Sequence, residues 1–216
     1  MTIARSHPTD SQRVLFASSV ALGGLTWQVA AGHLHTIDHR LAEWVATLRS
    51  ARLDGLIQAV AWFGGVEWTI GALAALGWWS WRRSGLSASL MYAGAYAGGF
   101  GLLMILRVLV GQWRPEATTL PTSMDVVTRF HLAGFPSGHA FRSAFVLGWL
   151  AHAMRQVSLR AARLVRFGCL LLIAAVGFTR VYLNRHWASD VVGAWLVAWV
   201  ALAIVPYWEG ARGRQP

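Results

Sequence analysis

Hydrophobic residues along this chain gather in long runs, and short polar stretches separate the runs. Six runs reach the length of about 17–25 residues that a helix needs to cross a bilayer. They cover residues 14–32, 56–79, 86–106, 138–154, 167–183 and 191–208. The pattern predicts an all-α fold, an integral membrane six-transmembrane-helix bundle that forms a single domain over residues 1–216. The fourth and fifth runs contain histidine and arginine, and ionisable residues inside a span are candidates for function.

The segment between the first two runs has a different pattern. Over residues 33–55, apolar side chains recur at helical spacing among polar ones. On one face of such a helix lie Leu41, Trp44, Val45 and Leu48. This pattern is typical of a helix that lies in the membrane interface, so we expect a short amphipathic interfacial helix after the first span.

The first run has a second interpretation as a signal peptide. Arg5 and Arg13 precede it, and Val29-Ala30-Ala31 resembles a cleavage site. The run is long for the hydrophobic part of a signal peptide, and five further runs follow it. We therefore expect an uncleaved first helix.

The composition agrees with a membrane protein, since 56% of the residues are hydrophobic and only 13% are charged. The formal net charge of +10 comes from arginine alone, because the sequence has no lysine. No basic helix or aromatic-basic motif accompanies the charge, so we expect no nucleic-acid partner. Cys169 is the single cysteine, which excludes an internal disulfide and a cysteine metal site.

Arginine placement predicts the orientation in the membrane. If six helices alternate, one side receives Arg82, Arg83, Arg155, Arg160, Arg163, Arg166, Arg212 and Arg214. Cytoplasmic loops carry such an excess, although Arg40, Arg49 and Arg52 oppose the rule. The connection 108–135 and the turn 184–189 then lie together on the outer side.

Three short fragments of the sequence carry candidate chemistry. The second of them, Pro136-Ser137-Gly138-His139, opens the fourth helix. Ser137 is placed to cap that helix, and the free backbone N–H groups that follow form an anion site. Gly138 lets a phosphate approach the backbone closely. His139 then projects from the first turn toward that site.

Two other fragments bring further charged groups to the outer side. His186 and Asp190 are spaced i, i+4, so the carboxylate can fix the imidazole tautomer and leave the other nitrogen free to attack. Arg180 can converge on the same point, because only a short turn separates it from His186. Guanidinium groups bind phosphate oxygens in bidentate fashion, which makes Arg107 and Arg114 candidates too. We expect the helix to end between those two arginines, so that Arg114 folds back.

Some polar residues outside these fragments have weaker candidate roles. Arg142 lies one turn after His139 and could reach a second phosphate, and Arg185 is a similar possible headgroup contact. Both also fit a simple role at the membrane interface. The chain offers no carboxylate cluster for a metal, and an exposed interfacial cluster explains His33, His35 and His39 better than a metal site does.

Taken together and in this order, the three fragments resemble the signature of the type 2 phosphatidic acid phosphatase superfamily of membrane lipid phosphatases. That signature is lysine, six residues, Arg-Pro; then Pro-Ser-Gly-His; then Ser-Arg, five residues, His, three residues, Asp. The second motif matches in full, and the departures are Arg107 in place of lysine and Thr179 in place of serine. The motifs lie in a core of about residues 100–208.

The resemblance implies a role for each residue. His186 would be the nucleophile and form a phosphohistidine, and Asp190 would orient it. His139 would protonate the leaving oxygen and then activate water. The phosphate oxygens would be held by Arg107, Arg114, Arg180 and the backbone of Ser137 and Gly138. The resemblance implies no metal and no cofactor.

The expected function is hydrolysis of a lipid phosphate or diphosphate at the periplasmic face of a bacterial inner membrane. Candidate substrates are undecaprenyl diphosphate, phosphatidylglycerol phosphate and phosphatidic acid. The motifs contact only phosphate, so they do not separate isoprenoid from glycerolipid. A transporter or receptor that binds the headgroup without hydrolysis stays open, and so does a lipid phosphotransferase. Six apolar runs argue against the soluble vanadium haloperoxidases of the same superfamily. The oligomeric state stays open.

Overall fold

The computed structural model describes residues 10–116, 132–154 and 159–212. Within these ranges the chain folds into eight helices, which confirms the all-α class. Their bounds are α1 (Asp10–Ala30), α2 (His35–Thr47), α3 (Ala51–Trp62), α4 (Val66–Ser84), α5 (Leu86–Val110), α7 (Gly138–Ala153), α8 (Leu159–Tyr182) and α9 (Ala188–Arg212).

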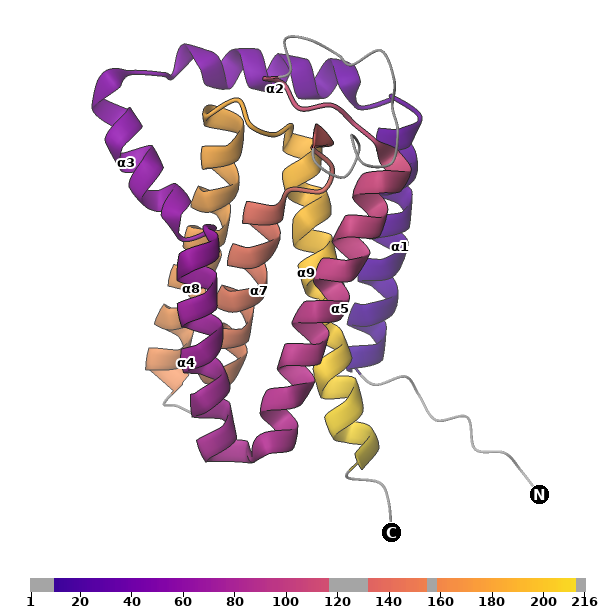
Figure 1. Cartoon of the computed structure of the whole chain (residues 1–216), viewed down its shortest axis with the longest axis vertical. Helices are drawn as coiled ribbons and strands as arrows, with labels where there is room; N and C mark the ends of the chain where they lie inside the picture. The colour runs from indigo at the N-terminus through magenta and orange to yellow at the C-terminus, as the bar shows by residue number, and fades with distance from the viewer. Residues whose placement is uncertain (1–9, 117–131, 155–158, 213–216) are drawn as a thin grey trace, which may run out of the picture.

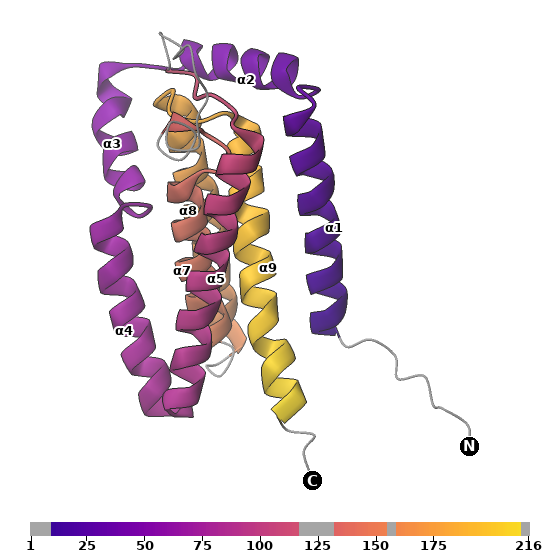
Figure 2. The same cartoon turned by 45° about the vertical axis from the view of Figure 1, so that its right-hand side comes forward.

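The long helices run side by side, and α2 lies across one end of the bundle (Figures 1 and 2). α9 packs against α1, α5 and α7, and α7 also packs against α8 and α4. Phe141 and Phe145 of α7 and Val197 of α9 are fully buried where these helices meet. The helix ends that carry the three motif fragments all lie at the α2 end of the bundle (Figure 1).

Three of the described helices, α5, α8 and α9, are long and apolar enough to cross a membrane. The number rises to five if each of two bent helix pairs is one span. One pair is α1 with α2, which meet at 89°, and the other is α3 with α4, which meet at 40°. α7 has 16 residues and is shorter than an ordinary span.

The sequence pattern predicted one helix for the second run. The structure instead breaks it between α3 and α4, at Phe63, Gly64 and Gly65. A Cβ atom on Gly64 would lie 2.8 Å from the backbone oxygen of His139 and 3.0 Å from its Cβ. The break therefore lies where the second run meets the first turn of α7. A glycine is required there because the two backbones approach so closely.

The predicted surface segment 33–55 is also shorter than expected. α2 ends at Thr47, and α3 already begins at Ala51 and leads back into the bundle. Along α2, Leu41 and Trp44 are exposed as expected of an interfacial helix. Val45, predicted on the same face, is instead buried against the bundle. The reason is that the apolar stripe is wider than the exposed face, so one edge of it packs on protein.

The helix ends agree with the predicted arrangement of arginines. α4 ends and α8 begins at the end of the bundle opposite α2, where α1 also begins and α9 ends (Figure 1). Arg155 and Arg214, and the side chain of Arg212, lie outside the described residues. Arg49, an exception to the charge rule, donates from Nε to the backbone oxygen of Tyr182 at 2.8 Å. Its position therefore follows from a protein contact.

Candidate active site

The end of α5 places two arginines beside each other. Gly111 adopts a left-handed conformation with φ of 63°, and its N–H caps the backbone oxygen of Arg107. The chain then reverses, and the following segment is held by a hydrogen bond of 2.6 Å from the Gly134 N–H to the Gln112 oxygen. Arg114 is thereby returned to the same cavity as Arg107, as the sequence predicted.

The first turn of α7 is fixed by backbone contacts. The Ser137 N–H donates to the Asp190 backbone oxygen at 3.0 Å, and Arg107 Nη2 donates to the Pro136 oxygen at 3.0 Å. Ser137 occupies the N-cap position, but the prediction that its side chain caps the helix is wrong. Its Oγ is buried and has no partner among the described residues, because the backbone is oriented by α9 instead. A Cβ on Gly138 would lie 3.3 Å from Arg142 Nη1.

The turn between α8 and α9 carries the candidate nucleophile. Asn184 has a positive φ of 58°, and the N–H groups of Arg185 and His186 both approach the Arg180 oxygen. His186 Nδ1 lies 3.2 Å from Asp190 Oδ2, which also accepts the Trp187 N–H at 2.9 Å. Because a carboxylate only accepts, Nδ1 carries the ring proton and Nε2 presents its lone pair.

These elements enclose one polar cavity of about 360 Å³. It is lined by Phe100, Met104, Arg107, Arg114, Gly138, His139, Arg142, Arg180, Arg185 and His186. Both candidate histidines and all five candidate arginines therefore meet in one place. Asp190 is fully buried behind His186, and Ser137 is fully buried at the start of α7.

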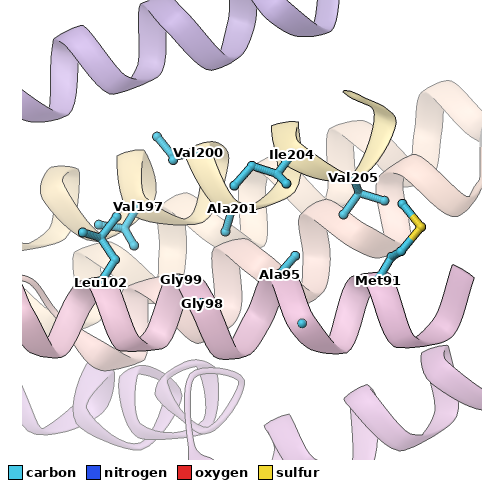
Figure 3. Close-up of a pocket in the computed structure, with 11 residues that line it drawn as sticks. Met91, Ala95, Gly98, Gly99, Leu102, Val197, Val200, Ala201, Ile204 and Val205 are labelled. Atoms are coloured by element: carbon cyan, nitrogen blue, oxygen red, sulfur yellow. The ribbon is translucent and has the colours of Figure 1, made fainter. Parts of the chain in front are cut away.

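A second hollow, of about 350 Å³, lies between α5 and α9 (Figure 3). Its lining is apolar and consists of Met91, Gly94, Ala95, Gly98, Gly99, Leu102, Val197, Val200, Ala201, Ile204 and Val205. This hollow is lined by no charged or titratable side chain, so it offers nothing that would hold a phosphate.

The electrostatics of the polar cavity favour an anion. Arg107 and Arg180 are buried, with 9% and 6% of their surface exposed. The Nε atoms of Arg107 and Arg114 are buried without a hydrogen-bond partner among the described residues, and buried charges are ordinarily paired. Burial lowers the pKa of His186 well below its ordinary value, and the charges of Arg114, Arg107 and Arg180 lower it further. His186 is therefore neutral at neutral pH, as its candidate role requires.

Two further cavity arginines, Arg142 and Arg185, also have partners within the protein. Arg142 donates from Nε to the Gly64 oxygen at 2.8 Å, and its Nη2 lies 3.2 Å from His139 Nδ1. Because a guanidinium group only donates, Nδ1 accepts, and His139 carries its proton on Nε2. Arg185 is paired with Glu116 at the rim of the cavity.

Sequence reasoning missed several residues of the site. Phe100 and Met104 precede Arg107 by seven and three positions, so helical spacing could have placed them on the same face. Glu116, next to the Arg114-Pro115 motif, lies 3.8 Å from Arg114 and also holds Arg185. Gly134 had no local signal. Within the described residues, no three His, Cys, Asp or Glu side chains come together as metal ligands would.

A Gly134→Ala substitution is expected to lower turnover by about 10²-fold, the cost of misplacing a catalytic group by about 1 Å. The added Cβ would lie 2.8 Å from Asp190 Oδ2 and 3.3 Å from Arg114 Cγ. Phosphate release by the purified variant measures the effect. Gly71→Ala is the matched control, because nothing lies within 4 Å of a Cβ at that position. Equal activity of the two variants would contradict the prediction.

Comparisons with known proteins found a matching family and a similar fold. A model of the PAP2 superfamily matches residues 86–214, which is more than half of the chain. The fold is similar to the crystal structure of the first transmembrane PAP2-type phosphatidylglycerolphosphate phosphatase from Bacillus subtilis, with a TM-score of 0.75 and 18% sequence identity. That match covers 91% of this chain and 98% of the other. The bundle is that of a multi-pass membrane protein.

Proposed function

The chain belongs to the PAP2 superfamily, and from that premise we propose that it hydrolyses a lipid phosphate through a phosphohistidine on His186. One observation carries the proposal. His186 Nδ1 faces the fully buried Asp190 at 3.2 Å, while the same ring lines a cavity that also contains Arg107, Arg114 and Arg180. A headgroup-binding transporter needs the arginines, but it has no need of an oriented, neutral imidazole.

The first step forms a bond between His186 Nε2 and phosphorus and breaks the bond to the lipid oxygen. The phosphate lies between the cavity arginines and the first turn of α7, where backbone N–H groups and the helix dipole favour an anion. The donors at this place are Arg107, Arg114, Arg180 and the backbone of Ser137 and Gly138. They stabilise the charge that develops on the equatorial oxygens. No metal takes part in this scheme.

His139 is the second participant in the chemistry. In its doubly protonated form it gives a proton to the leaving oxygen, and it then takes a proton from the water that attacks phosphorus. The water oxygen bonds to phosphorus, the bond to His186 breaks, and inorganic phosphate leaves. Arg142 has to leave Nδ1 before His139 can hold two protons. The anionic phosphate of either kind of substrate, once bound in the cavity, draws Arg142 away and permits this change, and Arg185 can contact the headgroup at the rim.

The membrane arrangement is part of the proposal. α1, the α3–α4 pair, α5, α7, α8 and α9 give six crossings in one domain. α7 is short, but α4, α8 and α9 pack around it, so it need not match the bilayer thickness. The arginine-bearing helix ends lie opposite the cavity, which supports the proposal that the cavity opens at the outer face of a bacterial inner membrane. There it meets undecaprenyl diphosphate, phosphatidylglycerol phosphate or phosphatidic acid laterally, with the headgroup at the interface.

The pH profile of kcat/KM tests the environment of His186. Because its pKa is lowered, the ring stays neutral as pH falls below about 6.5, and activity is lost only when pH passes the depressed pKa. Arg114→Gln removes a charge that lowers this pKa, so its acid limb is expected to move to higher pH than in the wild type. Arg185→Gln is the control, because that side chain is 57% exposed and water screens its charge. Unchanged limbs in both variants would contradict the assignment.

The experiment that tests the function is release of inorganic phosphate by the detergent-purified protein in the presence of EDTA. The three lipids named above are offered separately, and a His186→Ala preparation measures any contaminating phosphatase. Release above that background establishes a metal-independent lipid phosphatase and ranks its substrates. Headgroup binding without release would favour the transporter or receptor, and transfer of the phosphoryl group to a second lipid would favour the phosphotransferase.

A further inference from the structure

Asp38 of α2 is a buried carboxylate that reaches across the bundle end to α9. Only 3% of its surface is exposed. Its Oδ1 accepts the Ser189 backbone N–H at 3.0 Å, and its Oδ2 accepts the Ser189 hydroxyl at 2.6 Å. Aspartate is almost never fully buried unless it is paired, and the two hydrogen bonds to Ser189 supply that pairing for both oxygens.

The contact supplies a cap that α9 lacks in its own sequence. The first backbone N–H groups of a helix have no partner within the helix, and a side chain just before the helix normally accepts one of them. α9 begins at Ala188, and the side chain of the residue before it, Trp187, has a donor N–H and no acceptor. Asp38 therefore caps α9 from another helix. Asp190, the acidic residue of the first turn, remains available to His186.

α2 also holds the other side of the same turn. Arg49, just after α2, donates to the backbone oxygen of Tyr182, where α8 ends. Between these two contacts the His39 ring packs on Trp187, with the ring centroids 4.5 Å apart. α2 and the segment just after it are thus attached to the last residue of α8, to the turn and to the first turn of α9. His186 lies in the turn between these contacts.

We propose that Asp38 is a positioning residue for the reaction, which fixes the turn between α8 and α9 and so sets the position of His186 Nε2 against phosphorus. The inference rests on the proposed function. Asp38 does not line the polar cavity, so it acts on the substrate only through Ser189 and the turn. Losing it should therefore change the rate of the chemical step more than the binding of the headgroup.

The experiment compares Asp38→Ala, Asp38→Asn and Glu43→Ala with the wild type. Glu43 is the matched control, an exposed carboxylate on the same helix. Asp38→Ala is expected to lower kcat by about 10- to 100-fold with KM nearly unchanged, because misplacement of a reacting group slows the chemistry. Asparagine can still accept the Ser189 N–H and bond to its hydroxyl, so Asp38→Asn should restore most of the rate. Glu43→Ala should behave as the wild type.

The pH profile separates positioning from simple loss of folded protein. A loosened turn lets water reach His186, so the acid limb of kcat/KM in Asp38→Ala should move to higher pH. The charged and titratable groups around this ring are Arg107 of α5, Arg114, His139 of α7, Arg180 of α8 and Asp190 of α9. All of them remain in the variant. Asp38→Ala and Asp38→Asn both lose the Asp38 charge that acts on Asp190, so the shift is measured between these two variants.

Two outcomes overturn the inference. One is a wild-type kcat in Asp38→Ala, and the other is a loss of kcat that only follows the folded fraction, with an unchanged acid limb. A wild-type protein that releases no phosphate overturns the proposed function instead. Amide hydrogen exchange then still tests whether Asp38 fixes the turn. Asp38→Ala should speed exchange across residues 183–189, and Glu43→Ala should not.

Discussion

A His186→Ala protein is expected to lose lipid phosphate release by about 10⁴-fold or more, the scale of removing a nucleophile. The ring is the only described group whose lone pair both faces the cavity and is oriented by a buried carboxylate. Alanine leaves Asp190 and the arginines in place, so headgroup binding should survive while turnover does not. The measurement is phosphate release together with binding of the same lipid.

The intermediate itself can be observed. Brief mixing with a substrate labelled in the transferred phosphate, followed by alkaline quench, should leave label on the wild type and none on His186→Ala. His33→Ala is the control, because His33 is exposed and contacts Gln28 rather than the cavity. Label on His186→Ala would place the nucleophile elsewhere.

The residues that the sequence singled out do line one cavity, and the reason they could be found is chemical. Titratable residues are rare in apolar runs, so His139, Arg142 and Arg180 stood out against their surroundings. The spacing of His186 and Asp190 is a local helical relation, and the structure confirms that their side chains meet. Their catalytic roles remain predictions.

Contacts between distant segments could not be predicted. Asp38 and Ser189 are 151 positions apart, and neither lies in a motif. Gly134 has no local signal, since its importance comes from the approach of Asp190. Ser137 shows the reverse case, where a residue of the right type at the right position makes no capping bond. Tertiary contacts decided its orientation, and a local rule has no access to them.

The helices also divide into those that a local pattern predicts and those whose shape depends on distant contacts. Hydrophobic runs located α1, α5, α8 and α9, because burial in a bilayer requires apolar length. The run 56–79 did not indicate its break. The adjacent Gly64 and Gly65 are not a clear signal, because glycine is frequent in membrane helices. What determines the break is the backbone of His139 against Gly64, a contact between two different runs. The bend thus lies beside the cavity and holds Arg142 through the Gly64 oxygen.

A His139→Gln protein is expected to lose about 10²- to 10⁴-fold in turnover, the contribution of general acid–base catalysis, and to lose it differently for two kinds of substrate. When the substrate is a lipid monophosphate, the lipid departs as an alkoxide, which needs a proton, so the first step should fail. When the substrate is a lipid diphosphate, the lipid departs as its monophosphate, which is stable without an added proton. Its first step should therefore proceed and the second should not.

The two substrates consequently give different amounts of trapped enzyme. With the diphosphate, phosphorylated His186 should accumulate in His139→Gln, because no base activates the water that would release it. With the monophosphate, the same protein should carry little label. His33→Ala should turn over both substrates as the wild type does. Equal labelling by both substrates would show that the leaving oxygen takes its proton from another group.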